Sequence, residues 1–296
     1  MLMFPERQTT YGWLVATDIF LAGVGGGVFL ISVVLELLGK YETIAKTGTL
    51  LGPVLVLLGT FFLIAELGRK TRFYKLFTNL SSPSSWLSRG TWILIAFVIL
   101  GLAYSLPSFQ LFSWLPWSKT SALGQGIGIA AGLFSVLVII YPGFLFGVVK
   151  GIPFWNTPIL PFVFLFSSLS TGVAAIMLVA LLSGMNLEIT AVHHLGAAGI
   201  VLILILLLAL GVYLYITSHQ GFAAMESLRL LKTPLFISGA LIVGLVVPLA
   251  VLIYAVFVGD MLTISILTGV GSLCLLAGGL LLRYAIIRAG VYLSLR

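Results

Sequence analysis

Charge is scarce in this sequence. Only 8% of the 296 residues are Asp, Glu, Lys or Arg, whereas an ordinary soluble domain carries about 25%. Hydrophobic residues make up 60% of the chain, and its mean hydropathy is +1.22. These values exclude a water-soluble globule and also an intrinsically disordered chain, which is poor in apolar residues. The 33 Gly and 11 Pro show no short period, which excludes a collagen-like fibre.

Cysteine is almost absent. The single Cys274 lies in an apolar run, so an intramolecular disulfide is excluded, as is a cysteine cluster for zinc or an iron-sulfur centre. The chain also lacks a Ser/His/Asp arrangement, a phosphate-binding glycine loop and an HExxH motif. We therefore expect no metal site and no independent catalytic centre in this chain, and any metal centre belongs to a partner subunit.

Long apolar runs are what the sequence has in abundance. A helix needs about 20 apolar residues to cross a hydrocarbon core about 30 Å thick, and no run alternates as a β-barrel strand does. The sequence predicts an all-α integral membrane protein, a single polytopic domain over 1–296, built as two four-helix bundles. The N-terminus shows no signal-peptide cleavage pattern. The predicted spans are residues 11–38, 47–67, 90–106, 122–149, 158–183, 190–217, 233–258 and 262–287.

Basic residues are divided unequally between the two sides of the membrane. An even number of spans puts both termini on one side, called side A here. Most Lys and Arg lie on side A, together with Arg283 if that side chain extends outward, whereas side B has Lys40, Lys46 and Lys119. The positive-inside rule favours a cytoplasmic side A in the cell membrane. A basic face also suits docking of an acidic electron-transfer protein. Loop topology explains the net charge of +7 better than nucleic-acid binding does.

Two polar residues lie inside the spans near side A. Asp18 is seven residues into the first span, about 10 Å deep, where a carboxylate costs about 2.5–3.5 kcal/mol. Tyr141 lies at a similar depth, and Pro142 and Gly143 open the helix beside it. An acid and a phenol beside a glycine-rich helix predict a pocket for a quinone head group, which needs hydrogen bonds and flat apolar walls. The plain alternative for each residue is packing.

A further set of polar residues lies near side B. His193 and His194 follow each other on one helix and point about 100° apart, so they are not a pair of axial haem ligands on facing helices, and we expect no haem. With Glu36 they predict a proton route from side B towards Asp18. The alternative is a solvated interfacial set.

Five short motifs follow one another over residues 11–200. They resemble, in order and spacing, the membrane-subunit family of polysulfide reductase and its NrfD-like relatives. The motifs are DIFLAG with GGG at 18–27, AEL at 65–67 followed by Arg69 and Arg72, SSWLSRGTW at 84–92, YPG at 141–143 and PFWNTPILP at 153–161.

The resemblance implies a quinone-binding subunit without haem, docked to a ferredoxin-like iron-sulfur subunit that connects it to a molybdopterin enzyme. The quinone is menaquinone or ubiquinone, and the iron-sulfur clusters and molybdopterin stay in the partner subunits. Tyr141 falls on the tyrosine that hydrogen-bonds quinone in the family. Asp18 falls where relatives have a histidine or an acid. Tyr11 and Gly25 complete the expected quinone site.

The same resemblance places partner docking on side A. The expected docking residues are Arg69, Arg72, Arg89, Trp155 and Asn156. Glu66, at the end of the second span, is expected either to form a boundary ion pair or to belong to the proton path.

The combined hypothesis is a quinone-reactive subunit of a respiratory oxidoreductase, which exchanges electrons with the iron-sulfur partner and couples this to proton transfer. Two alternatives stay open. A stand-alone transporter would show paired broken helices in two matching halves. An inert membrane tether would bind no quinone.

Overall fold

Eight helices in the described part of the chain are long and apolar enough to cross a membrane. The computed structural model describes residues 3–66, 86–183 and 189–295. Each predicted span coincides over most of its length with one of these helices. The spanning elements are α1 (Trp13–Leu37), α2 (Glu42–Glu66), α4 (Trp86–Ser105), α5 (Ala122–Gly147), α6 (Leu160–Leu182), α7 (Ile189–Ser218), η5 (Leu235–Val246) with α9 (Val247–Phe257), and α10 (Met261–Arg288).

The helix ends differ from the predicted ends by a few residues. The largest difference is at α2, which begins at Glu42 instead of residue 47. The physical reason is that hydropathy marks the part of a helix that lies in lipid, whereas backbone hydrogen bonding continues through Lys46 to the loop at Tyr41.

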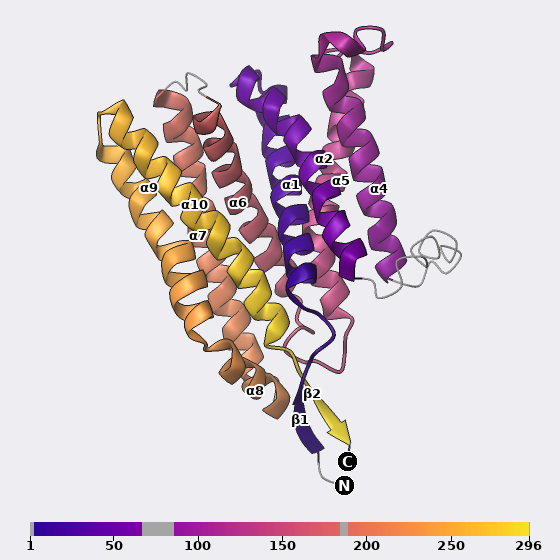
Figure 1. Ribbon diagram of the computed structural model, residues 1–296, viewed down its shortest axis with the longest axis vertical. Helices are drawn as coiled ribbons and strands as arrows, with labels where there is room; N and C mark the ends of the chain where they lie inside the picture. Colours follow the sequence, from indigo (N-terminus) through magenta and orange to yellow (C-terminus); the bar gives the residue numbers. More distant parts are fainter. Residues whose placement is uncertain (1–2, 67–85, 184–188, 296) are drawn as a thin grey trace.

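The helices form two groups that lie side by side (Figure 1). The first bundle contains α1, α2, α4 and α5, and the second contains α6, α7, η5 with α9, and α10. The two bundles meet where α1 packs against α6 and α10 and where α5 packs against α6. The expected arrangement of two four-helix bundles therefore holds for the described residues, with α1 at the centre of the molecule.

Glycine explains how α1 can pack on both sides. A Cβ at Gly25 would meet the Gly52 carbonyl of α2 at 2.5 Å, and a Cβ at Gly27 would overlap the Ser168 carbonyl of α6. Small residues let helix backbones approach closely in a membrane, where packing replaces the hydrophobic driving force. The glycine-rich stretch of α1 thus joins the two bundles.

The seventh span changes its winding halfway. It is a π-helix over η5 and becomes an α-helix at α9, where Pro248 lies in the first turn. Gly244 of η5 packs directly on Gly278 of α10, which keeps this irregular segment against its neighbour. Pro248 has no N–H, so it donates no backbone hydrogen bond at the point where the winding changes.

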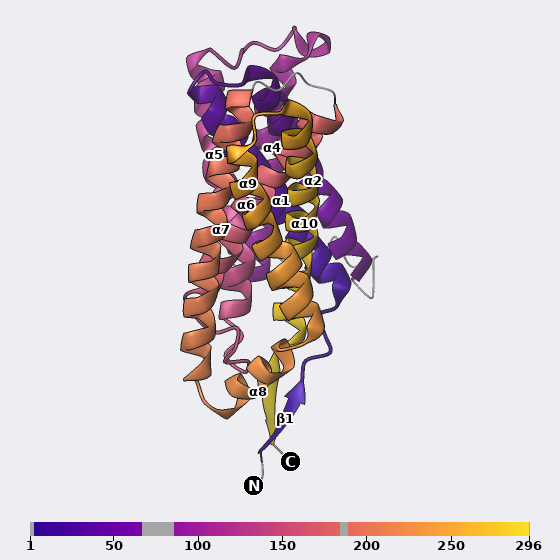
Figure 2. The same cartoon turned by 90° about the vertical axis from the view of Figure 1, so that its left-hand side faces the viewer.

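The two termini pair with each other, which the all-α prediction did not include. Strands β1 (Met3–Arg7) and β2 (Val291–Leu295) form an antiparallel ribbon that projects from side A beside the short helix α8 (Phe222–Leu231) (Figure 2). The Gln8 N–H donates to the Gly290 carbonyl at 2.9 Å. Positions that form hydrogen bonds across an antiparallel pair alternate with positions that do not, so the backbone nitrogen of Pro5, three residues earlier, points away from β2. The ribbon tolerates a proline at that outward position.

Candidate functional site

A large cavity lies inside the first bundle near side A. Its volume is about 170 Å³, measured on the scale on which one water molecule needs about 10–15 Å³, so it admits a ring-sized molecule. The lining is apolar apart from Tyr11, Asp18, Thr91 and Tyr141. The apolar lining residues are Val15, Ile19, Ala22, Leu63, Leu94, Val138, Pro142, Leu145 and Phe146.

Asp18 reaches the cavity because of its position on α1. Val15, Asp18, Ile19 and Ala22 follow the spacing that puts residues on one face of a helix, and this face lines the cavity. Asp18 is 8% exposed, and its Oδ1 atom is buried without a hydrogen-bond partner among the described residues. A buried oxygen of this kind is costly unless a ligand or a water completes its bonding.

Tyr141 enters the cavity from α5. Its ring packs against Gly90 of α4, where a Cβ would overlap the ring and the hydroxyl. The next residue, Pro142, cannot donate to the Val138 carbonyl, and Pro142 and Val138 both line the cavity. Tyr141 lines the same cavity as Asp18 and Tyr11. The structure therefore brings together three of the four residues predicted to bind quinone.

Gly25, the fourth, is not among the lining residues. It lies at the contact between α1 and α2, where a Cβ would also meet a Val56 methyl group at 2.9 Å. Its role in the described structure is close helix packing, as for the neighbouring glycines of α1. Sequence alone does not separate the two roles because glycine spacing does not show which side of α1 faces which helix.

An aromatic cluster closes the side-A end of the cavity. The Tyr11 ring lies edge-on to Phe146, with centroids 5.7 Å apart, and Phe146 lies 4.8 Å from Trp155. Trp155, predicted as a docking residue, is 1% exposed and donates its Nε1–H to the Ile286 carbonyl at 3.0 Å. In this protein Trp155 lies in the core and anchors the segment between α5 and α6.

The structure describes two of the other four predicted docking residues. Asn156 is exposed, and its side-chain amide donates to the Gly147 carbonyl. Arg89 is exposed and lies over the Trp86 ring, 5.1 Å from its centroid. Arg69 and Arg72 lie outside the described residues. Side A thus offers at least one exposed cation, Arg89, next to an aromatic side chain.

The predicted proton-path residues fall in separate places. Asp18 and Glu36 are both on α1, 18 residues apart, so about 27 Å separates them along the helix. Glu36 forms an ion pair with Lys119 at 2.9 Å. Lys119 also donates to Thr49 Oγ1 at 3.1 Å and lies over the Tyr104 ring. This cluster closes the side-B end of the first bundle, and no local sequence pattern indicates that Lys119 turns inward.

The two histidines belong to the second bundle and point in different directions. His194 is exposed, and its Nδ1 lies 2.6 Å from the hydroxyl of Tyr41. His193 is half-buried, and its Nε2 is buried without a partner among the described residues. Glu66 is the last residue of α2, at the side-A end. The structure therefore does not bring Glu36, the histidines and Asp18 into one contiguous set.

Arg283 is a buried polar residue that the sequence analysis assigned to side A only if its side chain extended outward. It does not extend to side A but is 0% exposed and points inward between the bundles. Its guanidinium donates to Ser168 Oγ at 2.7 Å, Ser167 Oγ at 3.1 Å and the Gly279 carbonyl at 2.9 Å. Among the described residues it forms no ion pair. The sequence feature that could have indicated this is the depth of Arg283. It lies five residues inside the last span, near the depth of the consecutive serines Ser167 and Ser168 of α6.

The fold and the cavity define a multi-pass helical membrane protein with a buried carboxyl and a phenol facing one internal cavity. The chain belongs to the NrfD family, whose profile, described as "Polysulphide reductase, NrfD", matches residues 2–293. This confirms the family that the five motifs indicated.

Three relatives illustrate the similarity. Protein NrfD of Escherichia coli is 29% identical over 60% of this chain and 61% of its own length. A polysulfide reductase chain from Wolinella succinogenes is 28% identical over 60% of each of the two sequences. The Protein NrfD homolog of Haemophilus influenzae is 26% identical over 92% of this chain and 94% of its own. The alignments with the first two span about three fifths of those relatives.

Proposed function

We propose that this chain is the quinone-reactive membrane subunit of a respiratory oxidoreductase. The observation that carries the proposal is the buried, unpartnered Oδ1 of Asp18 at a ring-sized cavity that also contains Tyr141. Ligand sites are apolar cavities with a few placed polar groups, and this cavity has that composition. A carboxyl group inside a membrane helix is by default functional.

The cavity residues suit a quinone head group. The Tyr141 hydroxyl donates a hydrogen bond to one carbonyl oxygen, and the Asp18 carboxyl holds the proton that the other oxygen exchanges. Phe146 and Leu94 supply apolar walls for a flat ring. When bound, a quinone supplies two-electron, two-proton redox chemistry. Because the cavity lies near side A, the electron donor or acceptor approaches from that side.

The proposed partner is a ferredoxin-like iron-sulfur subunit on side A, which connects this protein to a molybdopterin enzyme. The Wolinella relative is named as one chain of polysulfide reductase, and this name supports a multi-subunit setting. Exposed Arg89 and the loop at Asn156 offer a polar surface beside the cavity wall formed by α5. Replacing Arg89 with Glu is expected to release the iron-sulfur subunit during purification, whereas Lys40→Glu on side B leaves it bound.

For orientation we propose that side A faces the cytoplasm, because side A carries most of the basic loop residues. A reporter fused to the C-terminus distinguishes the two orientations. Activity of a cytoplasmic reporter supports the proposal, and activity of a reporter that works only outside the membrane refutes it.

The test of the proposed function compares three variants in the assembled complex. Asp18→Asn is expected to lower quinone-dependent turnover about 100-fold, since a positioned acid-base group contributes about 10²–10⁴-fold. Tyr141→Phe is expected to cost about two- to tenfold, because a hydrogen bond contributes about 0.5–1.5 kcal/mol. Tyr254→Phe, at a 60% exposed position on α9, is the matched control and should retain full turnover.

Bound quinone, extracted and quantified from the same preparations, separates the alternatives. An inert tether predicts no quinone and no effect of either cavity variant. A transporter predicts a protein that purifies alone. Quinone that co-purifies with the complex and decreases in Tyr141→Phe supports the proposal.

A further inference from the structure

A second, smaller cavity lies inside the second bundle near side B. Its volume is about 10 Å³, which is room for a single water molecule. Residues from α6, α7, α9 and α10 all contribute to its lining, so it lies in the interior of that bundle. The lining residues are Met177, Val192, His193, Gly196, Leu252, Ala255, Val256, Ile264 and Thr268.

Two side chains of this lining each have a polar atom without a partner. Nε2 of His193 and Oγ1 of Thr268 are both buried, and neither has a hydrogen-bond partner among the described residues. Thr268 is 1% exposed. In a membrane-spanning region an unsatisfied polar group costs several kcal/mol. One water molecule between the imidazole and the hydroxyl would satisfy both atoms at once.

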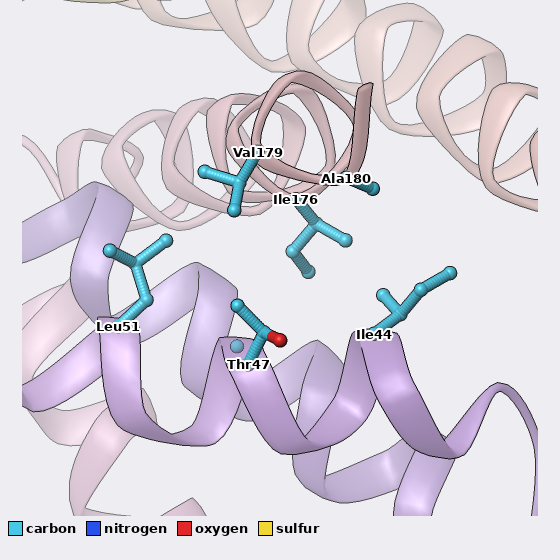
Figure 3. A pocket seen from close by; sticks show the side chains of 7 residues that line it. Ile44, Thr47, Leu51, Ile176, Val179 and Ala180 are labelled. Atoms are coloured by element: carbon cyan, nitrogen blue, oxygen red, sulfur yellow. The ribbon is translucent and has the colours of Figure 1, made fainter. Parts of the chain in front are cut away.

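A cavity of the same volume between α2 and α6 provides a comparison (Figure 3). Its lining is apolar apart from Thr47, and the Thr47 hydroxyl already donates to the Thr43 carbonyl at 2.9 Å. No polar side-chain atom of that lining requires a water, and small apolar cavities stay dry. The two cavities therefore have the same volume, but only the cavity in the second bundle has polar lining atoms without hydrogen-bond partners among the described residues.

The residue that follows His193 on α7 lies at the side-B surface. His194 follows His193 directly and is exposed, with Nδ1 against the Tyr41 hydroxyl. Neighbouring residues on a helix point about 100° apart, so one imidazole faces the side-B surface while the other faces the cavity. An imidazole can take up a proton on one nitrogen and release it from the other.

We propose that His193 and Thr268 hold a water molecule and form a proton-binding site in the second bundle, loaded from side B. In the loading step, Nε2 of neutral His193 accepts a proton from the bound water as that water receives one from side B. The O–H bond that the water loses to Nε2 is replaced by an O–H bond to the incoming proton, so the net change is one proton added to His193. The site is separate from the Asp18 cavity, and its role in turnover rests on the proposed quinone function.

Bound water is tested without any reference to quinone chemistry. Met177 lines the cavity and is 2% exposed, so its oxidation by hydroxyl radicals generated with X-rays reports a water beside it. In the purified complex, Met177 is expected to oxidise at the rate of an exposed methionine. Thr268→Val should slow this oxidation several-fold, and Thr47→Val, the same substitution at the dry cavity, should leave it unchanged. Slow Met177 oxidation in the wild type overturns the proposal.

The proton role is tested in vesicles that contain the complex. His193→Gln is expected to lower proton uptake from side B several-fold per turnover of quinone. Unchanged uptake in His193→Gln overturns the proton role even where Met177 is oxidised rapidly. If the wild type shows no quinone-dependent turnover, the proposed function fails, while the Met177 result still decides the water site.

Discussion

Gly90 of α4 lies against the phenol ring of Tyr141, so that a Cβ at position 90 would overlap the ring. This contact determines where the Tyr141 hydroxyl can lie in the cavity. The glycine belongs to the SSWLSRGTW motif and the tyrosine to the YPG motif. The two motifs, separated in sequence, therefore form one side of the candidate quinone site.

Gly90→Ala is expected to displace the Tyr141 ring and to lower quinone-dependent turnover about 10²-fold, the loss that a displacement of about 1 Å in a reacting group can cause. Assembly of the complex should be retained. The control is Gly126→Ala on α5, where an added Cβ meets nothing within 4 Å. Equal turnover of the two variants would contradict the positioning role of Gly90.

The contact between bundles leads to a second prediction. A Cβ at Gly27 would overlap the Ser168 carbonyl of α6, and overpacking of this kind costs about 1–3 kcal/mol. Gly27→Ala should therefore lower the thermal midpoint of the purified protein. Gly132→Ala, whose nearest neighbour atom is 3.9 Å away, should leave the midpoint unchanged. A stable Gly27→Ala variant would show that the bundles move apart without cost.

Arg283 gives a third prediction, about stability. Removing the Ser168 hydroxyl leaves one guanidinium nitrogen unpaired in the interior, which costs about 1–3 kcal/mol, so Ser168→Ala should lower the thermal midpoint. Arg283→Met fills a similar volume and removes a charge whose burial without an ion pair is costly. If Arg283→Met is at least as stable as the wild type, the arginine is retained for a reason other than stability. A large destabilisation would make it a structural residue.

The sequence was sufficient for the spans because the membrane imposes a simple requirement. Each helix must present about 20 apolar residues to lipid, and a run of that length is visible without knowledge of its neighbours. The depths of Asp18 and Tyr141 follow from the same rule by counting residues from the span ends. Their shared cavity was predicted for this reason, together with the family resemblance.

The direction in which a side chain points around its helix axis could not be predicted in the same way. Counting residues places Arg283 near side A, but the serines of α6 determine that it points inward, and they lie 115 and 116 positions away in sequence. The pairing of β1 with β2 joins residues at opposite ends of the sequence. Such contacts depend on tertiary packing, and local patterns do not contain them.

Lys119 provides a prediction about pH. Burial lowers the pKa of the Lys119 amine below the ordinary value of 10.5, even though Glu36 acts in the opposite direction. Between the lowered pKa and 10.5, the unfolded state binds more protons than the folded state, so the free energy of unfolding rises with pH in that window. Below the lowered pKa, both states hold the proton and this contribution does not vary.

The expected outcome is a difference between two stability curves. The thermal midpoint of the wild type should improve relative to that of Lys119→Met as the pH is raised to 10.5, because the variant lacks the titrating amine. Lys40→Met, which removes an exposed lysine of the same side, should follow the wild-type curve. Parallel curves for the wild type and Lys119→Met would mean that the half-buried ion pair with Glu36 keeps the amine charged throughout, so that the attraction of the carboxylate outweighs the loss of hydration.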